Sequence, residues 1–316
     1  MKSYKLILLL SVLLAISCSN EDDTFFKQEP AERIALQVSG NIASRATGNV
    51  WEQDDSIGIF MLRNSKQLAL ENIAEGAFNN CYVYRDGFTP MTDNDTVWFP
   101  RDPETKVDFI AYYPYSEIDN PILPVDRQTD VLYADRISGR DKSEPNVSFN
   151  FRHIMSRIEV ELIAGKGTNS KDLRNATVTL DKQPESGYCD LSDGSVTAEE
   201  VLATISLNGA TIIFPSEGME GRTLTFTLPE LGKVLTWEIP SNKEFKAGES
   251  TTFHVTVKKK GEVIPPEPEP DPTPDPGPGP NPDPEIELSV TDSTVTDWIP
   301  GNGEDGEQGN LEWPIE

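Results

Sequence analysis

The sequence predicts an all-β protein, and three observations support this prediction. Short segments that alternate between apolar and polar residues recur along most of residues 34–260, as expected for strands with one buried face. Turn-forming pairs such as Asp86-Gly87 and Asn208-Gly209 separate most of these segments. Only residues 66–77 and 198–203 look briefly helical, and neither has a full apolar stripe. Many short strands joined by turns favour β-sandwiches or barrels.

The composition excludes several classes of function. The 316 residues include 27 Lys and Arg against 53 Asp and Glu, which gives a net charge of −26. Because binding to phosphates requires clustered cationic side chains, this acidity argues against nucleic acid and anionic membrane surfaces as partners. Three cysteines and two histidines are too few for a disulfide scaffold or a conventional zinc site. The length suits two domains.

The N-terminus has the features of an export signal. Two lysines precede eleven uncharged residues, 6–16, which are too few to cross a bilayer of about 30 Å as a helix. The small residues that follow lead into Cys18 and resemble a bacterial lipobox, although Ala15 stands where leucine is usual. The resemblance implies a signal peptide over residues 1–17 and lipidation of Cys18. The alternative is an ordinary buried thiol near a conventional cleavage site.

Residues 18–30 are predicted to form a lipidated acidic tether. Each buried CH₂ group of a lipid chain contributes about 0.8 kcal/mol, and stable membrane anchoring takes more than one chain. A triacylated Cys18 would carry three chains. The acidic run Glu21-Asp22-Asp23 resembles the surface-export signal of lipoproteins from one phylum of Gram-negative anaerobes. We therefore expect a surface-exposed protein that is anchored in the outer membrane.

The body of the chain is expected to divide near Gly165. The clearest strand runs from His153 to Leu162, with Ile154, Ile158 and Val160 on one face. A run of glycine and polar residues from Ala164 to Ser170 follows it and is typical of a break between domains. The other expected strands lie at 34–38, 57–62, 81–84, 96–99, 107–113, 147–151, 176–180, 211–214, 223–228, 234–239 and 251–257.

A Pro-rich linker over residues 263–284 follows the body. Eleven of the twenty residues from Pro265 to Pro284 are proline. Such a chain holds polyproline II at about 3.1 Å per residue, so we expect a semi-rigid spacer that reaches roughly 60 Å. The tail from Glu262 to Glu316 contains fifteen acidic residues and no Lys or Arg. Charge repulsion should extend it further.

Strand-like sequence returns beyond the linker, in residues 285–316. Ile286, Leu288 and Val290 alternate strictly with polar residues, which is the pattern of a half-buried strand. Trp298 extends the apolar pattern, and residues 311–315 alternate again. A merely disordered tail would lack this apolar order.

Several motifs together resemble the fimbrillin family, the subunits of protease-assembled pili of Gram-negative anaerobes. Their order along the chain carries the resemblance, because no single motif is specific. After the lipobox these motifs are Ser44-Arg45-Ala46-Thr47, 51–60 (WEQDDSIGIF), 107–115 (VDFIAYYPY), 132–134 (LYA), 149–158 (FNFRHIMSRI) and 295–301 (VTDWIPG). The family implies two transthyretin-like β-sandwich domains in tandem, residues 31–165 and 166–262, followed by the spacer and the C-terminal strand segment.

The resemblance also implies a mechanism of assembly. The first strand, 34–38, would complete the N-terminal sheet of the precursor until an Arg-specific protease cuts after Arg45 and leaves Ala46 as the new N-terminus. The open edge would then accept a neighbour's C-terminal strand by β-augmentation. The candidate donor residues are Ile286, Leu288, Val290 and Trp298.

Two alternatives to this mechanism remain open. Arg45 can be a plain surface arginine, like Arg33 or Arg63, in which case the uncleaved chain would stay tethered as an anchor or a standalone surface protein. The segment 286–299 can fold back onto the chain's own C-terminal sheet, with the Pro-rich stretch as a long surface loop.

No motif for catalysis, a metal or a cofactor is found in the sequence. His153 and His254 both lie in strand patterns, and neither has a cysteine or carboxylate at ligand spacing. Asp93-Asn94-Asp95 lacks the glycine and the distal glutamate of a calcium loop, so a polar turn is the better interpretation. Cys81 and Cys189 fall in different predicted domains, where they can pair in an oxidising envelope or remain buried free thiols.

The predicted function is a structural subunit of a cell-surface pilus and not an enzyme. Its partners would be other pilus subunits, the outer membrane through the lipid anchor, and host or bacterial surface ligands. The alternative is a monomeric glycan-binding or adhesin lipoprotein, in which exposed Trp51, Trp98 or Trp237 would stack on sugars. Shaft, tip and anchor subunits are all compatible with the sequence.

Overall fold

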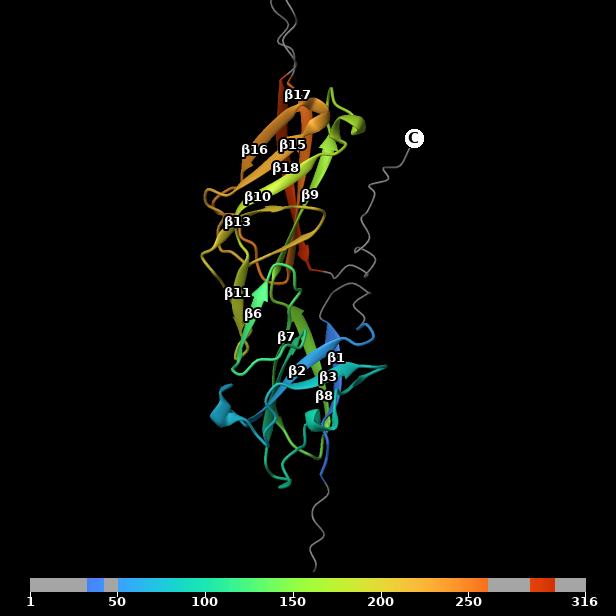
Figure 1. Cartoon of the computed structure of the whole chain (residues 1–316), viewed down its shortest axis with the longest axis vertical. Coiled ribbons are helices and arrows are strands. Elements are labelled where there is room, and N and C mark those ends of the chain that lie inside the picture. The colour runs from blue at the N-terminus through green and yellow to red at the C-terminus, as the bar shows by residue number, and fades with distance from the viewer. Residues whose placement is uncertain (1–32, 43–50, 261–284, 299–316) are drawn as a thin grey trace, which may run out of the picture. The chain divides into compact units, whose positions relative to one another are not determined.

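The computed structural model describes residues 33–42, 51–260 and 285–298, and confirms an all-β protein (Figure 1). These residues form one compact unit with eighteen strands and four one-turn 3-10 helices. The stretch 66–77 contains a single 3-10 turn, Leu70–Asn72. Residues 198–203 comprise the end of one strand (Ser195–Ala198), a three-residue connection and the start of the next strand (Leu202–Ser206). Neither is therefore a helix of the kind that local sequence suggested. No helix in the described ranges is long and apolar enough to cross a membrane.

The N-terminal strands close into a seven-stranded barrel, where we expected an open sandwich. The order around the barrel is β1-β4-β3-β2-β5-β7-β8. The strands are β1 (Gln37–Ile42), β2 (Ser56–Arg63), β3 (Asn80–Tyr84), β4 (Phe88–Pro90), β5 (Val107–Tyr113), β7 (Leu132–Arg140) and β8 (Asn146–His153). All neighbours are antiparallel except β1 and β8, which run parallel.

The barrel is filled by the alternate side chains of these strands. Fully buried members include Ile57 and Ile59 of β2, Phe109 of β5, and Phe149 and Phe151 of β8. The first strand begins and ends later than expected, at 37–42 in place of 34–38. Ser39-Gly40-Asn41 looks like a turn in the sequence, but in the structure it continues the ladder along β8.

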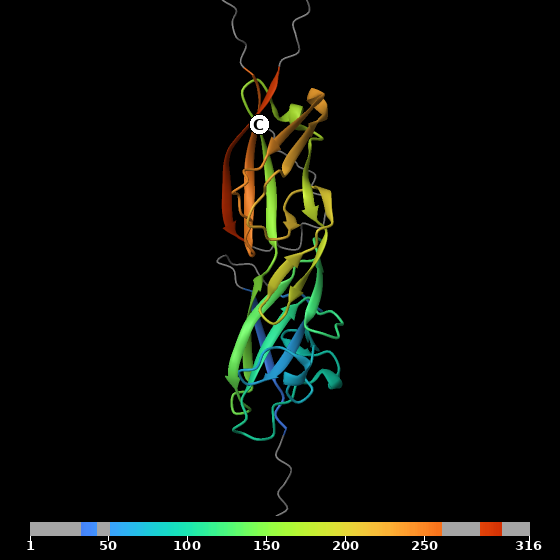
Figure 2. The same cartoon turned by 90° about the vertical axis from the view of Figure 1, so that its left-hand side faces the viewer.

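The C-terminal half is a sandwich of two four-stranded sheets, as Figure 2 shows. One sheet has the order β14-β9-β17-β18 and the other has the order β13-β10-β15-β16. Leu180, Leu224, Phe226 and Val255 are fully buried in the core that these strands share. The first sheet consists of β9 (Ser156–Ala164), β14 (Thr211–Ile213), β17 (Glu249–Lys259) and β18 (Ile286–Asp297). The second consists of β10 (Thr177–Pro184), β13 (Leu202–Ser206), β15 (Thr223–Leu228) and β16 (Lys233–Glu238).

The expected boundary near Gly165 is not where the sheets change. Strand β9, which we had assigned to the first sandwich, pairs with β14 and β17 of the second. The change of sheet occurs between β8 and β9, after His153. A third sheet also crosses the expected boundary, because β6 (Ile122–Asp126) pairs with β11 (Ser186–Asp190), which in turn pairs with β12 (Ser195–Ala198). Alternation along a strand fixes its faces but not its partners, so the sequence could not give these pairings.

Gly165 has a packing role at the end of β9. Its N–H donates to Val257 O at 2.9 Å. A Cβ at this position would lie 2.6 Å from Thr256 Cγ2 and 3.1 Å from the Val257 carbonyl oxygen. The glycine therefore allows close approach to β17, and it is not a hinge between domains.

Cys81 and Cys189 are buried free thiols and do not pair. Burial raises the pKa of Cys189 to about 12, with Asp190 and Asp193 adding to the effect. Burial, followed by the nearby Asp95, raises the pKa of Cys81 to about 11. Tyr112 is also buried in the core, and burial raises its pKa to about 12. These groups are therefore neutral over the physiological pH range.

Replacing Gly165 by alanine is expected to lower the free energy of unfolding by about 1–3 kcal/mol, because the added methyl group overpacks the contact with β17. Denaturant unfolding monitored by tryptophan fluorescence measures the change. Adding Thr256→Ser removes the closest atom and should restore part of the loss. A fully stable Gly165→Ala chain would contradict this role.

The raised pKa values predict that stability falls at alkaline pH. A neutral acid whose folded pKa exceeds its unfolded value, near 9 for cysteine and 10 for tyrosine, stabilises the fold below the unfolded pKa. This contribution is lost as pH rises from about 9 through 12. We expect the urea midpoint to drop over that range, and iodoacetamide at pH 8 to label Cys81 and Cys189 only after unfolding. Rapid labelling of either thiol in the native protein would contradict the assignment.

Candidate functional site

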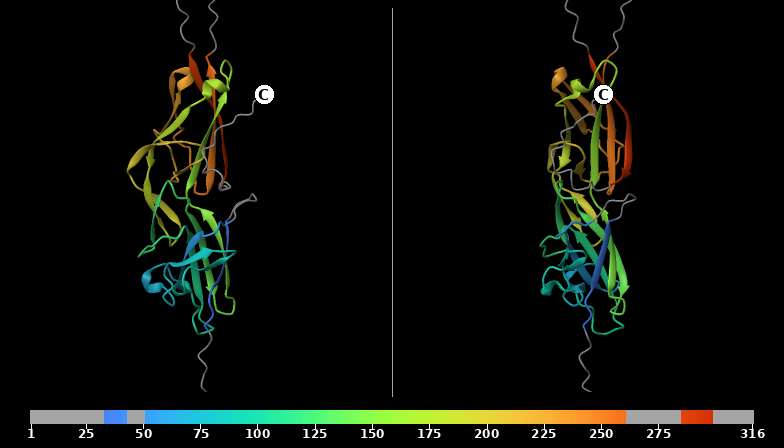
Figure 3. Two further views of the ribbon diagram at one scale, coloured as in Figure 1. Left: turned by 45° about the vertical axis from the view of Figure 1, so that its right-hand side comes forward. Right: turned by 90° about the vertical axis from the view of Figure 1, so that its right-hand side faces the viewer.

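Strand β1 is the element that closes the barrel (Figure 3). It pairs in parallel with β8 at six positions, from Gln37↔Asn146 to Ile42↔Phe151. On its other side it meets β4 at one position, Val38↔Phe88. Strand β1 is therefore attached to the barrel by extensive pairing with β8 and by little pairing with β4.

The segment just before β1 also belongs to this closure. Leu36 N–H donates to Val97 O at 2.9 Å, and Phe99 N–H donates to Ile34 O at 3.0 Å. Every second residue faces inward, and all of these inward residues except Gly40 carry an apolar side chain, while the intervening side chains of β1 are exposed. Leu36 is only 4% exposed, and Ile34, Val38 and Ile42 pack against the same buried cluster.

Removing residues 33–42 would leave two kinds of surface without a partner. The backbone N–H and C=O groups along one edge of β8 would lose their ladder, and an unpaired edge is a template for another strand. The apolar side chains beneath, including Phe88 and Phe151, would be uncovered. The arrangement can thus accept an extended peptide by β-augmentation, in which backbone bonds give affinity and alternate side chains give specificity.

The second strand of interest, β18, lies at the edge of the C-terminal sheet. It pairs antiparallel with β17 at eleven positions, from Glu249↔Asp297 to Lys259↔Ile286. Ile286 is 8% exposed, and Leu288 and Val290 pack against the core of the sandwich. Three of the four candidate donor residues therefore lie on one strand, in the fold-back arrangement that the sequence left open.

Trp298 anchors the end of β18. Its ring is 4% exposed and stacks on His153, with centroids 4.5 Å apart and planes at 6°. The backbone N–H of Trp298 donates to Gly248 O at 2.6 Å. The ring belongs to a buried cluster with Phe60 and Leu62 of the barrel and Phe214 that follows β14. Release of β18 would therefore uncover this cluster as well as the sandwich edge.

The segment that leads into β1 and the first half of β18 carry the same apolar spacing, which the sequence analysis above does not use. Residues 34–40 read Ile-Ala-Leu-Gln-Val-Ser-Gly, and residues 286–292 read Ile-Glu-Leu-Ser-Val-Thr-Asp. Ile, Leu and Val alternate identically in both segments. The two differ at the fourth inward position, where β1 has Gly40. Comparison of the two ends of the chain would have revealed the match.

The remaining predicted site residues lie outside the described ranges. These are the lipidation residue Cys18 and the cleavage pair Arg45 and Ala46. Arg45 falls in the stretch 43–50, which lies between the end of β1 and Trp51. Their roles remain predictions.

The three tryptophans proposed as sugar platforms have different environments. Trp51 is 8% exposed and packs edge-on against Phe88 and Phe151, so it has no free face for a sugar. Trp98 is partly exposed, but the Arg33 guanidinium lies 4.9 Å from its ring centroid. Trp98 also lines a shallow polar pocket beside Asn80 and Thr96. Trp237 lines a different surface pocket, in which a second aromatic ring, Phe253, stands beside it.

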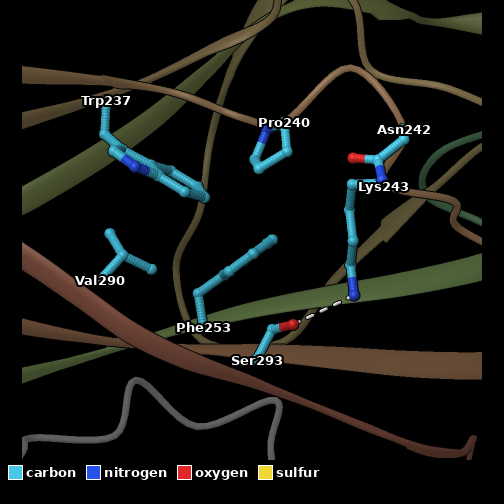
Figure 4. A pocket seen from close by; sticks show the side chains of 7 residues that line it. All are labelled: Trp237, Pro240, Asn242, Lys243, Phe253, Val290 and Ser293. Carbon is cyan, nitrogen blue, oxygen red and sulfur yellow. Dashed lines mark hydrogen bonds between the residues drawn. The ribbon is translucent and has the colours of Figure 1, made fainter.

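Figure 4 shows this pocket, which has a volume of about 290 Å³. Trp237 and Phe253 form an aromatic wall with Val290 of β18. Polar groups come from Asn242 and from Lys243, whose Nζ donates to Ser293 Oγ at 3.1 Å. An aromatic surface beside amide and ammonium donors has the chemistry to contact a sugar.

Both histidines have a carboxylate partner that the sequence did not reveal. His153 Nδ1 lies 2.8 Å from Asp130 Oδ1, and its Nε2 has no hydrogen-bond partner among the described residues. His254 Nδ1 lies 2.7 Å from Glu161 Oε2, while its Nε2 lies 3.2 Å from a β18 hydroxyl. Within the part of the chain that the structure describes, no group of three or more potential ligands could hold a metal ion.

Comparison with known proteins shows matches along most of the chain. The model of a family described as fimbrillin-like matches residues 44–298. A protein of Bacteroides uniformis with the name "Putative fimbrium subunit Fim1C" is 30% identical over 327 residues, which span 96% of this chain and 97% of that protein.

Solved structures show the same fold. A crystal structure of a Bacteroides uniformis protein, described as a "putative cell adhesion protein", covers 84% of this chain and 99% of its own, with 27% identity and a TM-score of 0.64. A Bacteroides ovatus protein with the same description has 19% identity and a TM-score of 0.59 over 85% of this chain and 99% of its own. Because the family model spans most of the sequence and the relative is similar over nearly its full length, this chain belongs to the fimbrillin-like family.

Proposed function

We propose that this chain is a structural subunit of a cell-surface pilus, exported as a lipoprotein and assembled by protease-triggered strand exchange. The observation that carries the proposal is the position of β1, which closes the barrel mainly through β8. It is followed in the sequence by residues 43–50, which contain Arg45. A cut after Arg45 would separate β1 from the body without breaking any described strand. The same cut would detach the body from the lipid on Cys18.

Cleavage is needed in this proposal because a covalently tethered β1 would outcompete the donor strand of another molecule for the groove. While β1 is covalently joined to the body, its effective concentration at the groove is of the order of millimolar, the usual magnitude for a segment on a short tether. A donor strand of equal affinity from another molecule would seldom displace it. Once the link is cut, β1 can leave and be diluted, and the donor of the next subunit can occupy its place.

The energetic gain of exchange need not be large. Each inward side chain of β1 contributes about 1.5–3 kcal/mol of burial, but ordering a strand costs about 1–2 kcal/mol per residue. A donor that makes the same contacts as β1 gains nothing relative to it. Long pilus lifetime would then depend on slow release from the groove.

Strand β18 is the donor that this proposal assigns. Ile286, Leu288 and Val290 repeat the spacing of three residues that pack into the barrel core, Ile34 and Leu36 before β1 and Val38 within it. Donation would require β18 to leave β17 and Trp298 to leave its stack on His153. The Pro-rich linker 263–284 would let the released strand reach a neighbour. In the alternative, β18 stays on its own sheet and completes the sandwich.

In this proposal the protein is a lipid-anchored precursor on the outer membrane surface and then part of a fimbrium. The proposal treats the barrel and the sandwich as the counterparts of the two transthyretin-like domains that the family resemblance implies. Other pilus subunits are its partners. The bonding scheme requires no cofactor and no enzymatic activity.

A second candidate function is glycan binding at the surface. It is favoured by the pocket beside Trp237, which combines aromatic walls with Asn242 and Lys243. Retention of the intact protein on a glycan array, lost in Trp237→Ala and kept in Trp98→Ala, would favour this function.

Replacing Arg45 by alanine is expected to abolish assembly in the producing bacterium, because β1 would remain tethered. SDS-resistant ladders that contain this chain should disappear, and the uncleaved precursor should accumulate in the membrane fraction. N-terminal sequencing of the wild-type polymer should begin at Ala46. Immunoblots of surface fractions measure all three outcomes.

Two matched variants accompany this experiment. Arg63→Lys alters another exposed arginine and should leave the ladders unchanged. Cys18→Ser should move the precursor out of the membrane fraction. Ladders of normal intensity from Arg45→Ala cells would contradict the proposed cleavage.

A further inference from the structure

The inward face of β1 has one position without a side chain. Apolar residues occupy the other inward positions before and after it, up to Ile42. Gly40 interrupts this series although its backbone conformation does not require glycine, since its φ is outside the left-handed region. The reason for the glycine must therefore lie in its surroundings.

Three aromatic rings surround this position. A Cβ on Gly40 would lie 3.0 Å from Phe88 Cε2 and 3.1 Å from Phe151 Cε2. It would also lie 3.3 Å from Trp51 Nε1. These separations are tighter than ordinary van der Waals contact, so a methyl group fits only if the rings shift and a larger group does not fit. We call this place the aromatic constriction, formed by Trp51, Phe88 and Phe151.

The constriction resists adjustment because its rings support one another. Trp51 makes edge-to-face contacts with Phe88 at 5.0 Å and with Phe151 at 5.1 Å between centroids. A third edge-to-face contact joins it to Tyr113 at 5.5 Å. The three rings of the constriction come from the segment before β2, from β4 and from β8. Moving one of them disturbs several elements.

The constriction also fixes the register of the strand. Trp51 Nε1 donates to Gly40 O at 2.7 Å, which holds the indole ring against the glycine. A shift by one residue would turn the apolar side chains outward. A shift by two would bring the side chain of Val38 or Ile42 into the constriction. One register therefore satisfies all contacts.

We propose that the aromatic constriction selects which strand can replace β1. This inference rests on the proposed strand exchange and specifies the partner. The groove accepts a strand that runs parallel to β8 and has three apolar residues at alternate positions, with glycine two positions after the last of them. Alanine in place of this glycine is tolerated poorly. Since Trp51 follows residues 43–50, the constriction stays with the body after cleavage.

The chain's own β18 fails this requirement at one position. When Ile286, Leu288 and Val290 are aligned with the corresponding residues of β1, Asp292 falls at the place of Gly40. A carboxylate there would meet three rings and be removed from water, which is unfavourable. The natural donor for this groove is thus the strand of a different subunit with glycine at that position, and a homopolymer joined through β18 is disfavoured.

A peptide exchange assay on the full-length chain, cut within residues 43–50, tests this selection. Fluorescent nine-residue peptides compete with the retained β1 segment, and anisotropy gives their relative affinities. The set contains residues 34–42, the same peptide with Gly40→Ala or Gly40→Val, and an outward control with Ser39→Val. The set also includes a β18 peptide of residues 286–294, both unchanged and with Asp292→Gly.

We expect the Gly40→Val peptide to bind at least about tenfold more weakly than the parent, with Gly40→Ala in between. The Ser39→Val control should bind like the parent. Asp292→Gly should improve the β18 peptide by about tenfold or more. In a chain with Phe88→Leu, which removes the nearest ring, the preference for glycine over alanine should largely disappear.

Two results separate this inference from the proposed function. If the parent peptide exchanges but Gly40→Val binds equally well, strand exchange stands and the selection is wrong. If the parent peptide does not exchange at all, the proposed strand exchange fails and the selection fails with it.

Discussion

The described structure depends on the pairing between β1 and β8. Strand β8 has β7 on one side and β1 on the other, and β1 is the last strand needed to remove the open edge of the barrel. The strand that performs this closure has six residues and lies at the start of the body. It makes a single pair with β4, so most of the strand pairing that its departure would break lies along β8.

The opposite end of the chain supplies a strand of matching chemistry. Strand β18 uses the same Ile-x-Leu-x-Val spacing to cover the sandwich, where eleven pairs with β17 and the buried ring of Trp298 hold it. This member of the fimbrillin-like family thus has one strand, β1, that completes the barrel, and a similar strand, β18, that extends the sandwich. Because Asp292 stands at the position that corresponds to Gly40, the groove that binds β1 should not accept β18 equally well.

The sequence predicted the strands far better than their partners. Alternation located β9, β17 and β18 because a half-buried strand exposes every second side chain. It could not show that β9 joins the second sandwich or that β6 pairs with β11, since these contacts join residues that are distant along the chain. The sequence around Gly165 is typical of a linker, and its steric role does not show there because it depends on Thr256, which is distant along the chain. The part played by Gly40 was missed for the same reason. The burial of Trp51 excluded it as a sugar platform only once its neighbours were known.

Hydrogen exchange of the β8 amides that point toward β1, within residues 146–151, tests the central claim most directly. The intact chain should protect these amides, and cutting it within residues 43–50 followed by removal of β1 should abolish that protection while leaving β17 protected. Adding a peptide of residues 34–42 should restore it. Protection of β8 that survives loss of β1, or a loss of protection that spreads through the whole body, would contradict the account of β1 as a replaceable closing strand.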